Sequence, residues 1–149
     1  PYIDENNIGI FGWSYGGYMS SLCITKGADV FKSAIAVAPV TNWRYYDNIY
    51  TERFMQKPQD NGENYDINSP INHVEKLKGN YLLIHGTADD NVHFQNATEM
   101  VSALVNKNKQ FEFFAYPDKN HGIYGGFTRL HLYTKMTNFL MKTLMEDNE

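Results

Sequence analysis

"IGIFGWSYGGYMSS" (residues 8–21) joins a short apolar run to a serine between glycines and then to a second apolar stretch. The run at Ile8–Phe11 has the length and the β-branched content of a buried strand, whereas Met19–Thr25 is apolar enough to pack as a helix. Gly27 is expected to end that helix. Ser14 is therefore expected at a turn that leads from a strand into a helix.

The composition is typical of one globular domain with a substantial core. The chain has 149 residues, of which 42% are hydrophobic and 20% are charged, and a domain of this size buries roughly 70% of its unfolded surface. The net charge of −4 gives no support to nucleic-acid binding, which needs clustered Lys and Arg. No stretch approaches the roughly 18 apolar residues of a membrane span, and Pro1 opens no signal peptide. Cys23 has no partner for a disulfide within the chain and is expected to be a small buried apolar side chain.

Strand-like and helix-like segments alternate along the rest of the chain. Residues 42–72 form a polar excursion, with a helix-like patch at Trp43–Phe54 and then a loop to Pro70. The alternation predicts an α/β fold, with a mostly parallel sheet of about four strands and helices on both faces. The further expected strands are Ser33–Val37, Tyr81–His85 and Phe111–Tyr116, and the further expected helices are Asn96–Val105 and Leu130–Met145.

The residues from Gly12 to Gly16 fit the pattern G-x-S-x-G, in which a sharp turn exposes the serine hydroxyl. The glycines of such a turn let the helix pack closely on the strand. The N–H of Tyr15 would lie at the start of the helix, where it could help to bind an oxyanion. A glycine-rich turn with an incidental serine is the alternative. The strand before the motif and the helix after it favour the nucleophile.

A serine nucleophile needs a base and a carboxylate that orients the base. In α/β hydrolases the three residues follow in the order Ser, Asp, His. Asp89 and Asp90 follow the third expected strand, and His121 follows the fourth. Parallel strands end at the edge of the sheet where such folds bind ligands, so these side chains are expected near Ser14. Spacing alone does not choose between the two aspartates.

The other histidines have simpler interpretations. His85 closes a strand and is expected to be a structural residue with its hydrogen bonds satisfied, His73 lies in the polar excursion, and His131 starts the last helix. His93 is the one competitor for a functional role, because His85, Asp89 and His93 recur every four residues, a spacing that would suit metal ligands on one face of a helix. That segment runs from a strand into a loop, so the spacing does not place the three on one face. No recognised zinc motif is present, and neither a metal nor another cofactor is expected.

Four stretches together resemble the catalytic domain of the prolyl oligopeptidase family: "GWSYGGYMSS", "AVAPVTNWRYYDNIYTERFM", "YLLIHGTADDNVHFQ" and "DKNHGI". The serine motif is shared across that family, whereas "GTADDNVHFQ" and the Trp-Tyr-Tyr segment resemble its dipeptidyl peptidase IV and fibroblast activation protein branch. The likeness runs from about Ile8 to the last helix. It implies an α/β-hydrolase fold and a serine peptidase that releases Xaa-Pro dipeptides from peptides with a penultimate proline, through an acyl-enzyme.

The resemblance also assigns roles to residues. It makes Ser14 the nucleophile, His121 the general base and acid, and Asp89 rather than Asp90 the orienting carboxylate. It matches Asn91 to a residue that binds the backbone carbonyl of the substrate. The positions that it matches to the wall of the pocket for the residue before the cleaved bond are Tyr15, Val40, Trp43, Tyr46, Tyr50 and Val92.

The aromatic residues of that set also stand out without the resemblance. Trp43, Tyr46 and Tyr50 fall at i, i+3 and i+7, which places them on one face of a helix, and Phe54 extends the stripe. Aromatic residues on one face of a helix usually pack into the hydrophobic core. The polar tips of tryptophan and tyrosine would also suit a pocket wall, and a rigid apolar pocket would favour the compact ring of proline.

The resemblance implies that residues 1–149 are the C-terminal part of the α/β-hydrolase domain, without the family's β-propeller. A second oxyanion donor and the acidic residues that bind the substrate's amino terminus would then lie elsewhere in the parent, which is expected to be secreted, periplasmic or membrane-anchored. The isolated chain is expected to be weakly active or inactive, and to form a homodimer through an exposed strand edge. Two alternatives stay open: another α/β hydrolase, such as an esterase or oligopeptidase, and a non-catalytic fragment that only associates.

Overall fold

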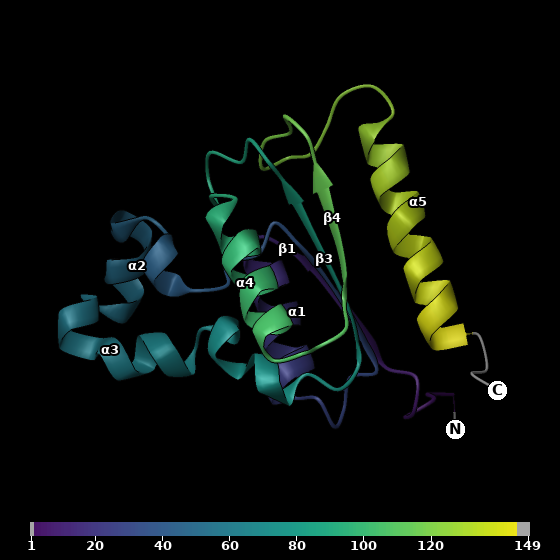
Figure 1. Ribbon diagram of the computed structural model, residues 1–149, viewed down its shortest axis with the longest axis horizontal. Coiled ribbons are helices and arrows are strands. Elements are labelled where there is room, and N and C mark those ends of the chain that lie inside the picture. The colour runs from purple at the N-terminus through teal and green to yellow at the C-terminus, as the bar shows by residue number, and fades with distance from the viewer. Residues whose placement is uncertain (1, 146–149) are drawn as a thin grey trace.

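The computed structural model describes residues 2–145 and contains one sheet of four parallel strands (Figure 1). The strands are β1 (Gly9–Trp13), β2 (Ser33–Val37), β3 (Asn80–Gly86) and β4 (Glu112–Tyr116). They lie in the sheet in the order of the sequence, so β2 and β3 are central. Because every pair is parallel, all four carboxyl ends lie at the same edge of the sheet.

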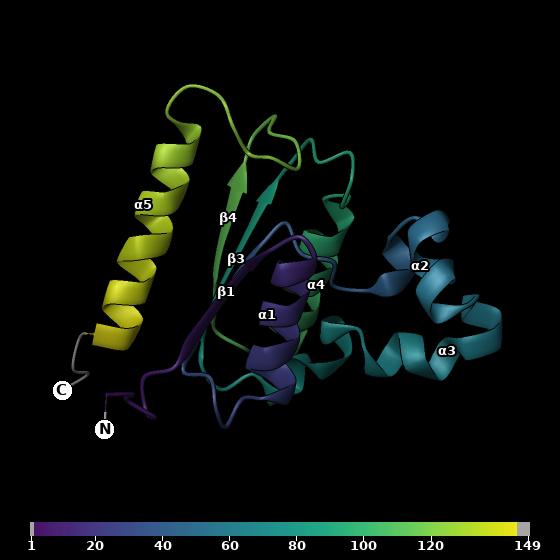
Figure 2. The same cartoon turned by 180° about the vertical axis from the view of Figure 1, so that it is seen from behind.

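Helices cover both faces of the sheet, which confirms the expected α/β architecture (Figures 1 and 2). On one face lie α1 (Tyr15–Lys26), the 3-10 helix η2 (Pro70–Lys76) and α4 (Gln95–Asn106). On the other lies α5 (Thr128–Leu140), which continues into η3 (Met141–Met145). The buried side chains that join the first layer to the sheet include Ile24, Leu83, Met100 and Leu104, and those of the second include Ile35, Ile84, Leu132 and Phe139.

The central strands are buried along almost their whole length. Every residue of β2 is buried, and so is every residue of β3 except Asn80. A parallel strand covered by helices on both faces needs apolar or small side chains at successive positions, which is the pattern of "SAIAV" and "YLLI". Among the described residues, no helix is long and apolar enough to cross a membrane.

The excursion between β2 and β3 differs from the sequence prediction. The single helix expected at Trp43–Phe54 is wrong, because the chain forms the 3-10 helix η1 (Trp43–Tyr45) and then a separate helix, α2 (Asn48–Met55). Asp47 causes the break, since its side chain accepts the N–H of Tyr50 at 2.8 Å and caps the start of α2.

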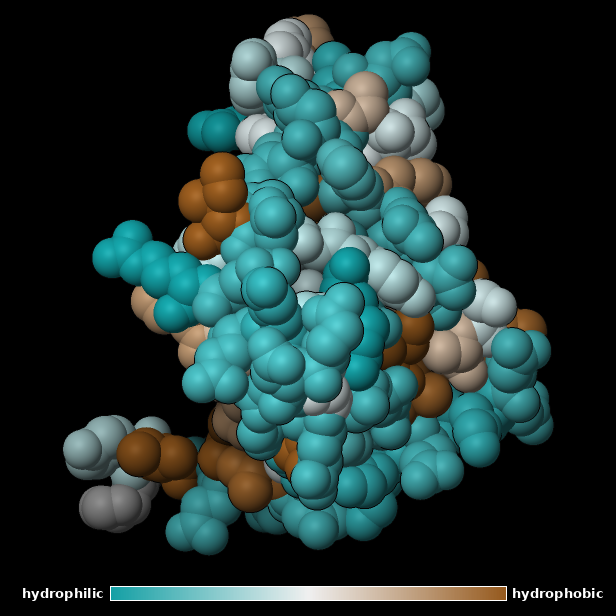
Figure 3. Space-filling view, turned by 90° about the vertical axis from the view of Figure 1, so that its left-hand side faces the viewer, coloured by the Kyte–Doolittle hydropathy of each residue, from teal (hydrophilic) through white to brown (hydrophobic). Residues whose placement is uncertain are grey.

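The polar loop expected before Pro70 is also wrong, because it contains the helix α3 (Pro58–Ile67), kinked at Asn61. Pro58 stands in the first turn of α3, where its missing N–H removes no helical hydrogen bond. The polar sequence of α3 reflects its position at the surface, and the face over α2 and α3 is largely hydrophilic (Figure 3).

Candidate active site

Ser14 occupies the turn between β1 and α1 with φ 57° and ψ −117°. A non-glycine residue held at such dihedral angles costs about 1–3 kcal/mol, so the surrounding structure has to fix it. The N–H of Ser14 donates to the carbonyl oxygen of Val37 at 2.8 Å, and its own carbonyl accepts the N–H of Tyr18 at 2.9 Å. The strained turn is therefore anchored to both β2 and α1.

Two glycines allow α1 to approach the sheet at this turn. A Cβ added to Gly12 would lie 2.1 Å from the carbonyl oxygen of Gly16, and one added to Gly17 would lie 2.8 Å from the carbonyl oxygen of Val37. A Cβ on Gly16 would meet nothing within 4 Å. The expected close packing thus depends on Gly12 and on Gly17, which lies outside the five-residue motif.

Tyr15 is the first residue of α1, so its N–H has no acceptor within the helix. This N–H lies beside the Ser14 side chain and belongs to the positive end of the helix dipole, which favours a negatively charged oxygen.

Asp89 lies in the loop that follows β3, and its side chain is fully buried. Its Oδ1 atom accepts the N–H groups of Asn91 at 3.0 Å and Val92 at 2.9 Å. Burial acts to raise the pKa of Asp89, but hydrogen bonds from His121, His85 and Asn91 outweigh it and hold that pKa well below its usual value. Asp89 is therefore ionised, whereas the neighbouring Asp90 is exposed to solvent.

His121 lies in the loop after β4, with its Nδ1 atom 2.7 Å from Asp89 Oδ2. An ionised carboxylate accepts, so Nδ1 carries the proton, and the neutral ring keeps Nε2 as a proton acceptor. The backbone carbonyl of His121 accepts the indole N–H of Trp13 at 3.0 Å. Because Trp13 directly precedes Ser14, this bond ties the histidine loop to the serine turn.

The loops after β3 and β4 are held together at their bases. The N–H of Thr87 donates to the carbonyl of Tyr116 at 3.0 Å, and that of Ala88 donates to the carbonyl of Lys119 at 3.1 Å. A Cβ on Gly86 would lie 2.2 Å from the carbonyl oxygen of Lys119. Only glycine lets the two backbones approach this closely, and their approach brings Asp89 to His121.

The structure brings Asp89 and His121 into contact and places Ser14 on the same edge of the sheet. Within the described part of the chain, no hydrogen bond joins Ser14 Oγ to His121 Nε2. Serine–histidine contacts are often long in free enzymes and tighten when substrate binds. Both atoms are thus available to a reacting group.

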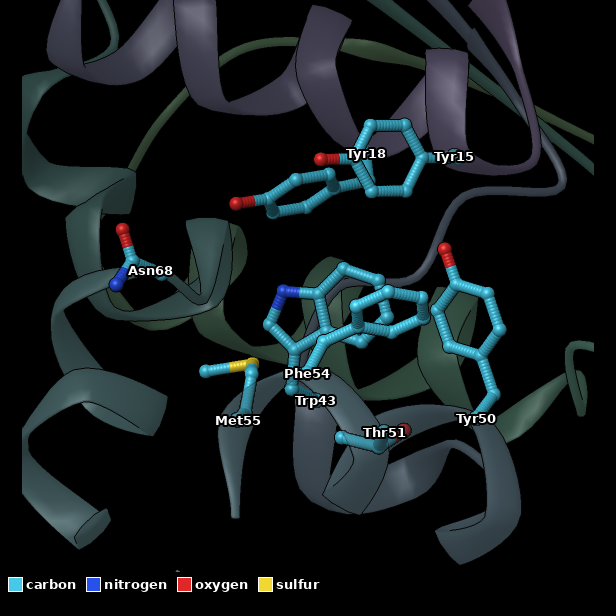
Figure 4. Close-up of a pocket in the computed structure, with 8 residues that line it drawn as sticks. All are labelled: Tyr15, Tyr18, Trp43, Tyr50, Thr51, Phe54, Met55 and Asn68. Carbon is cyan, nitrogen blue, oxygen red and sulfur yellow. The ribbon is translucent and has the colours of Figure 1, made fainter.

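A cavity of about 370 Å³ lies between the start of α1 and the helix α2 (Figure 4). Tyr15 and Tyr18 form one wall, and Trp43 and Phe54 face them from the other. The ring centroids of Tyr15 and Trp43 are 6.0 Å apart, and Tyr50 lies nearly parallel to Trp43 at 6.2 Å. The remaining lining residues are Thr51, Met55 and Asn68.

The sequence of the chain matches the model of the prolyl oligopeptidase family over residues 1–147. The chain belongs to the prolyl oligopeptidase family. It is 53% identical over 142 residues to prolyl endopeptidase FAP of Mus musculus and 47% identical over 142 residues to dipeptidyl peptidase 4 of Felis catus. These relatives confirm the expected branch of the family.

Solved structures agree with the sequence relatives. The chain superposes on the crystal structure of dipeptidyl peptidase 4 from Porphyromonas gingivalis with a TM-score of 0.95 and 50% identity, over 97% of this chain and 20% of that one. The two curated relatives match over 93% of this chain and 19% of their own length. The chain thus spans about a fifth of the length of these members of the prolyl oligopeptidase family.

The predicted substrate-binding residues of this prolyl oligopeptidase chain divide into two groups. Tyr15, Trp43 and Tyr50 line the aromatic cavity. Val40 and Val92 are buried in the cluster that packs behind it and do not line it. Although the predicted helical stripe does not exist, its aromatic residues still meet, because η1 and α2 fold back on each other.

Tyr46 and Asn91 lie outside the aromatic cavity and are joined to each other. The hydroxyl of Tyr46 donates to Asn91 Oδ1 at 2.7 Å, and burial raises the pKa of Tyr46, which keeps it a donor. The pair lines a neighbouring hollow of about 520 Å³. With Oδ1 occupied, the NH₂ group of Asn91 is left to donate elsewhere.

Sequence reasoning missed four residues that line the cavity: Tyr18, Thr51, Met55 and Asn68. Tyr18 follows Tyr15 by three positions on α1, so helical spacing from the serine turn could have found it. The other three come from α2 and from the end of α3, and their position depends on the fold of the excursion.

The other four histidines of this family member make no hydrogen bond to His121 within the described residues. His73 contacts the carbonyl of Ile67, and His131 Nδ1 lies 2.7 Å from the hydroxyl of Tyr116. His93 is exposed, and within residues 2–145 no three His, Cys, Asp or Glu side chains gather as a metal site would require. His85 is buried, and the prediction that its hydrogen bonds are satisfied is wrong, because Nδ1 has no partner among the described residues.

Proposed function

We propose that this chain is the C-terminal part of the catalytic α/β-hydrolase domain of a dipeptidyl peptidase 4-type serine peptidase. Ser14 is the nucleophile, His121 is the general base and acid, and Asp89 orients His121. The observation that carries the proposal is the 2.7 Å contact between His121 Nδ1 and the buried Asp89, beside a serine on a strained strand-to-helix turn.

The reaction is acyl transfer in two halves. His121 Nε2 takes the proton of Ser14 Oγ as that oxygen attacks the peptide carbonyl, and the N–H of Tyr15 donates to the oxyanion that forms. His121 then gives its proton to the leaving amine as the C–N bond breaks. In the second half, water deprotonated by His121 attacks the acyl-enzyme, and His121 returns the proton to Ser14 Oγ as the ester bond breaks and the acid is released.

The aromatic cavity supports a substrate with proline before the cleaved bond. A cavity walled by Tyr15, Trp43 and Tyr50 offers flat apolar surfaces to a compact ring whose φ is already fixed, with Val40 and Val92 buried behind them. The NH₂ group of Asn91, oriented by the Tyr46 hydroxyl, suits a backbone carbonyl of the substrate. Release of an N-terminal Xaa-Pro dipeptide is the proposed activity of the whole enzyme.

The chain alone is proposed to react slowly. It spans about a fifth of its relatives, and the family resemblance assigns the second oxyanion donor and the residues that bind the substrate's amino terminus to the rest of the protein. Loss of one oxyanion donor lowers rates by about 100- to 1,000-fold. Phosphonylation of Ser14 by a fluorophosphonate, in which Oγ attacks phosphorus and fluoride leaves, should survive such a loss better than peptide cleavage does.

Intact mass spectrometry after exposure to a fluorophosphonate tests the proposal. We expect one adduct on the wild-type chain and none on Ser14→Ala, with circular dichroism showing that both are folded. A folded wild-type chain that gains no adduct, or equal labelling of Ser14→Ala, would overturn the assignment of Ser14. Turnover of simple esters without any cleavage of Gly-Pro anilide by the whole enzyme would indicate an esterase instead.

A further inference from the structure

His85 is a buried histidine beside the candidate site, to which the proposed reaction gives no role. It lies near the end of β3 and its side chain is fully buried. Its Nε2 atom lies 2.8 Å from the carbonyl oxygen of Val92 and 3.2 Å from Asp89 Oδ2. A carbonyl oxygen can only accept, so Nε2 carries a proton that it donates to Val92 while it lies close to Asp89 Oδ2.

The surroundings of the other ring nitrogen, Nδ1, favour the uncharged form of His85. Nδ1 is buried and has no hydrogen-bond partner among the described residues, and the ring packs edge-on against Phe94. A charged ring would bury an Nδ1–H donor without an acceptor among the described residues, which is unfavourable. The neutral form, with its proton on Nε2, leaves only an unpaired acceptor. His85 therefore faces Asp89 as a neutral donor.

Asp89 accepts three hydrogen bonds and also lies 3.2 Å from His85 Nε2, with a clear division between its two oxygens. Oδ1 accepts the backbone N–H groups of Asn91 and Val92, while Oδ2 lies close to the imidazoles of His121 and His85. The two backbone hydrogen bonds hold Oδ1 in place, but neither of them contacts Oδ2. Within the described residues, His85 is the residue of β3 that lies next to Oδ2.

We propose that His85 is a positioning residue that holds Oδ2 of Asp89 toward His121, so that one carboxylate oxygen is shared by two imidazoles. His85 is attached to a central strand of the sheet, whereas Asp89 and His121 lie in loops. The contact therefore limits the movement of Asp89, and through it of His121, by tying them to a rigid strand. Supporting hydrogen bonds have this role around other active sites. The expected effect on the reactivity of Ser14 rests on the proposed function, whereas the expected effect on the Asp89–His121 contact does not.

Proton NMR of the 149-residue chain tests the geometric part. The His121 Nδ1 proton bonded to a carboxylate gives a separate low-field resonance, assigned by its loss in His121→Gln. His85→Phe keeps an aromatic ring and removes the donor, and we expect it to weaken the resonance or move it upfield. His85→Gln can place its amide N–H where Nε2 was, and we expect it to restore the resonance.

Fluorophosphonate labelling tests the catalytic part. We expect His85→Phe to label Ser14 about 100-fold more slowly, as expected from a misplacement of about 1 Å, and His85→Gln to recover most of that loss. A wild-type chain that shows the resonance but never labels would contradict the proposed function and leave the positioning role supported.

Two results would overturn the positioning role. The first is a folded His85→Phe chain with the His121 resonance unchanged, which would mean that His85 only anchors the Val92 carbonyl. The second is failure of His85→Gln to restore the resonance, whether folded or unfolded, because its amide supplies the same donor. His73→Phe, a matched change at a histidine far from Asp89, should leave the resonance and the labelling rate unchanged.

Discussion

At the scale of single residues, the adjacent aspartates Asp89 and Asp90 show what spacing could not decide. Both follow β3, but only Asp89 turns inward and contacts His121, whereas Asp90 faces solvent. The choice is made by two backbone N–H groups that cap Asp89 Oδ1, and such loop geometry leaves no periodic signal in the sequence. The order Ser, Asp, His could be predicted, but the contact that separates the two aspartates could not.

We expect Asp89→Asn to slow fluorophosphonate labelling of Ser14 by about 10³- to 10⁴-fold, because the amide no longer holds His121 in the tautomer that accepts a proton at Nε2. Asp90→Asn is the matched control and should label at the wild-type rate. Labelling rates of the folded variants check this prediction. An equal loss in Asp90→Asn alone would transfer the role to that residue.

The charge of Asp89 should also make the stability of the chain depend on pH. Folding lowers the pKa of Asp89, so the ionised carboxylate stabilises the folded state at pH values above its ordinary pKa of about 4. That contribution is lost as the pH falls below about 4 toward the lowered value. Urea unfolding at pH 7 and at pH 3 measures the loss.

The variant Asp89→Asn isolates this contribution, since it carries no titrating group at position 89. We expect its free energy of unfolding to fall less between pH 7 and pH 3 than that of the wild type. An identical fall in both chains would show that other carboxylates account for the acid sensitivity.

At the scale of elements, the match between sequence and structure follows burial. β2 has the predicted bounds because all five of its residues are buried and apolar or small. The excursion was predicted poorly because its breaks come from a side-chain cap at Asp47 and a proline at position 58, and both act locally on a polar sequence. Hydrophobic periodicity carries little information where an element faces solvent.

The packing of α1 on the sheet gives a prediction at the same scale. We expect Gly12→Ala to lower the free energy of unfolding by about 3 kcal/mol, because its Cβ would overlap the backbone of Gly16. Gly16→Ala is the matched control, since its Cβ meets nothing within 4 Å and alanine favours a helix by about 0.5–1 kcal/mol. Chemical denaturation of both variants checks this, and equal destabilisation would contradict the steric account.

At the scale of the whole molecule, β1 forms one edge of the sheet, and no strand pairs with its outer side among the described residues. Phe11, in the middle of β1, is 52% exposed. An exposed, apolar strand edge is a template for pairing with another chain. This edge supports the proposed self-association of the chain.

We expect sedimentation velocity to show a dimer or larger species that dissociates on dilution. Phe11→Lys should shift the equilibrium toward monomer, because a lysine on an edge strand opposes pairing. Leu130→Lys changes a residue of α5 that is 66% exposed and should leave association unchanged. A monomer at high concentration would contradict the proposal, and a response to Leu130→Lys alone would place the interface on α5.

The strand order has a consequence for how the protein is made. Because β1 to β4 lie side by side in the order in which a ribosome synthesises them, each new strand can add to the edge left by the one before. Ser14 directly follows β1, whereas His121 follows β4. During translation the proposed nucleophile therefore waits without its base until about four-fifths of this chain has been synthesised, and the proposed site stays incomplete until β4 has docked.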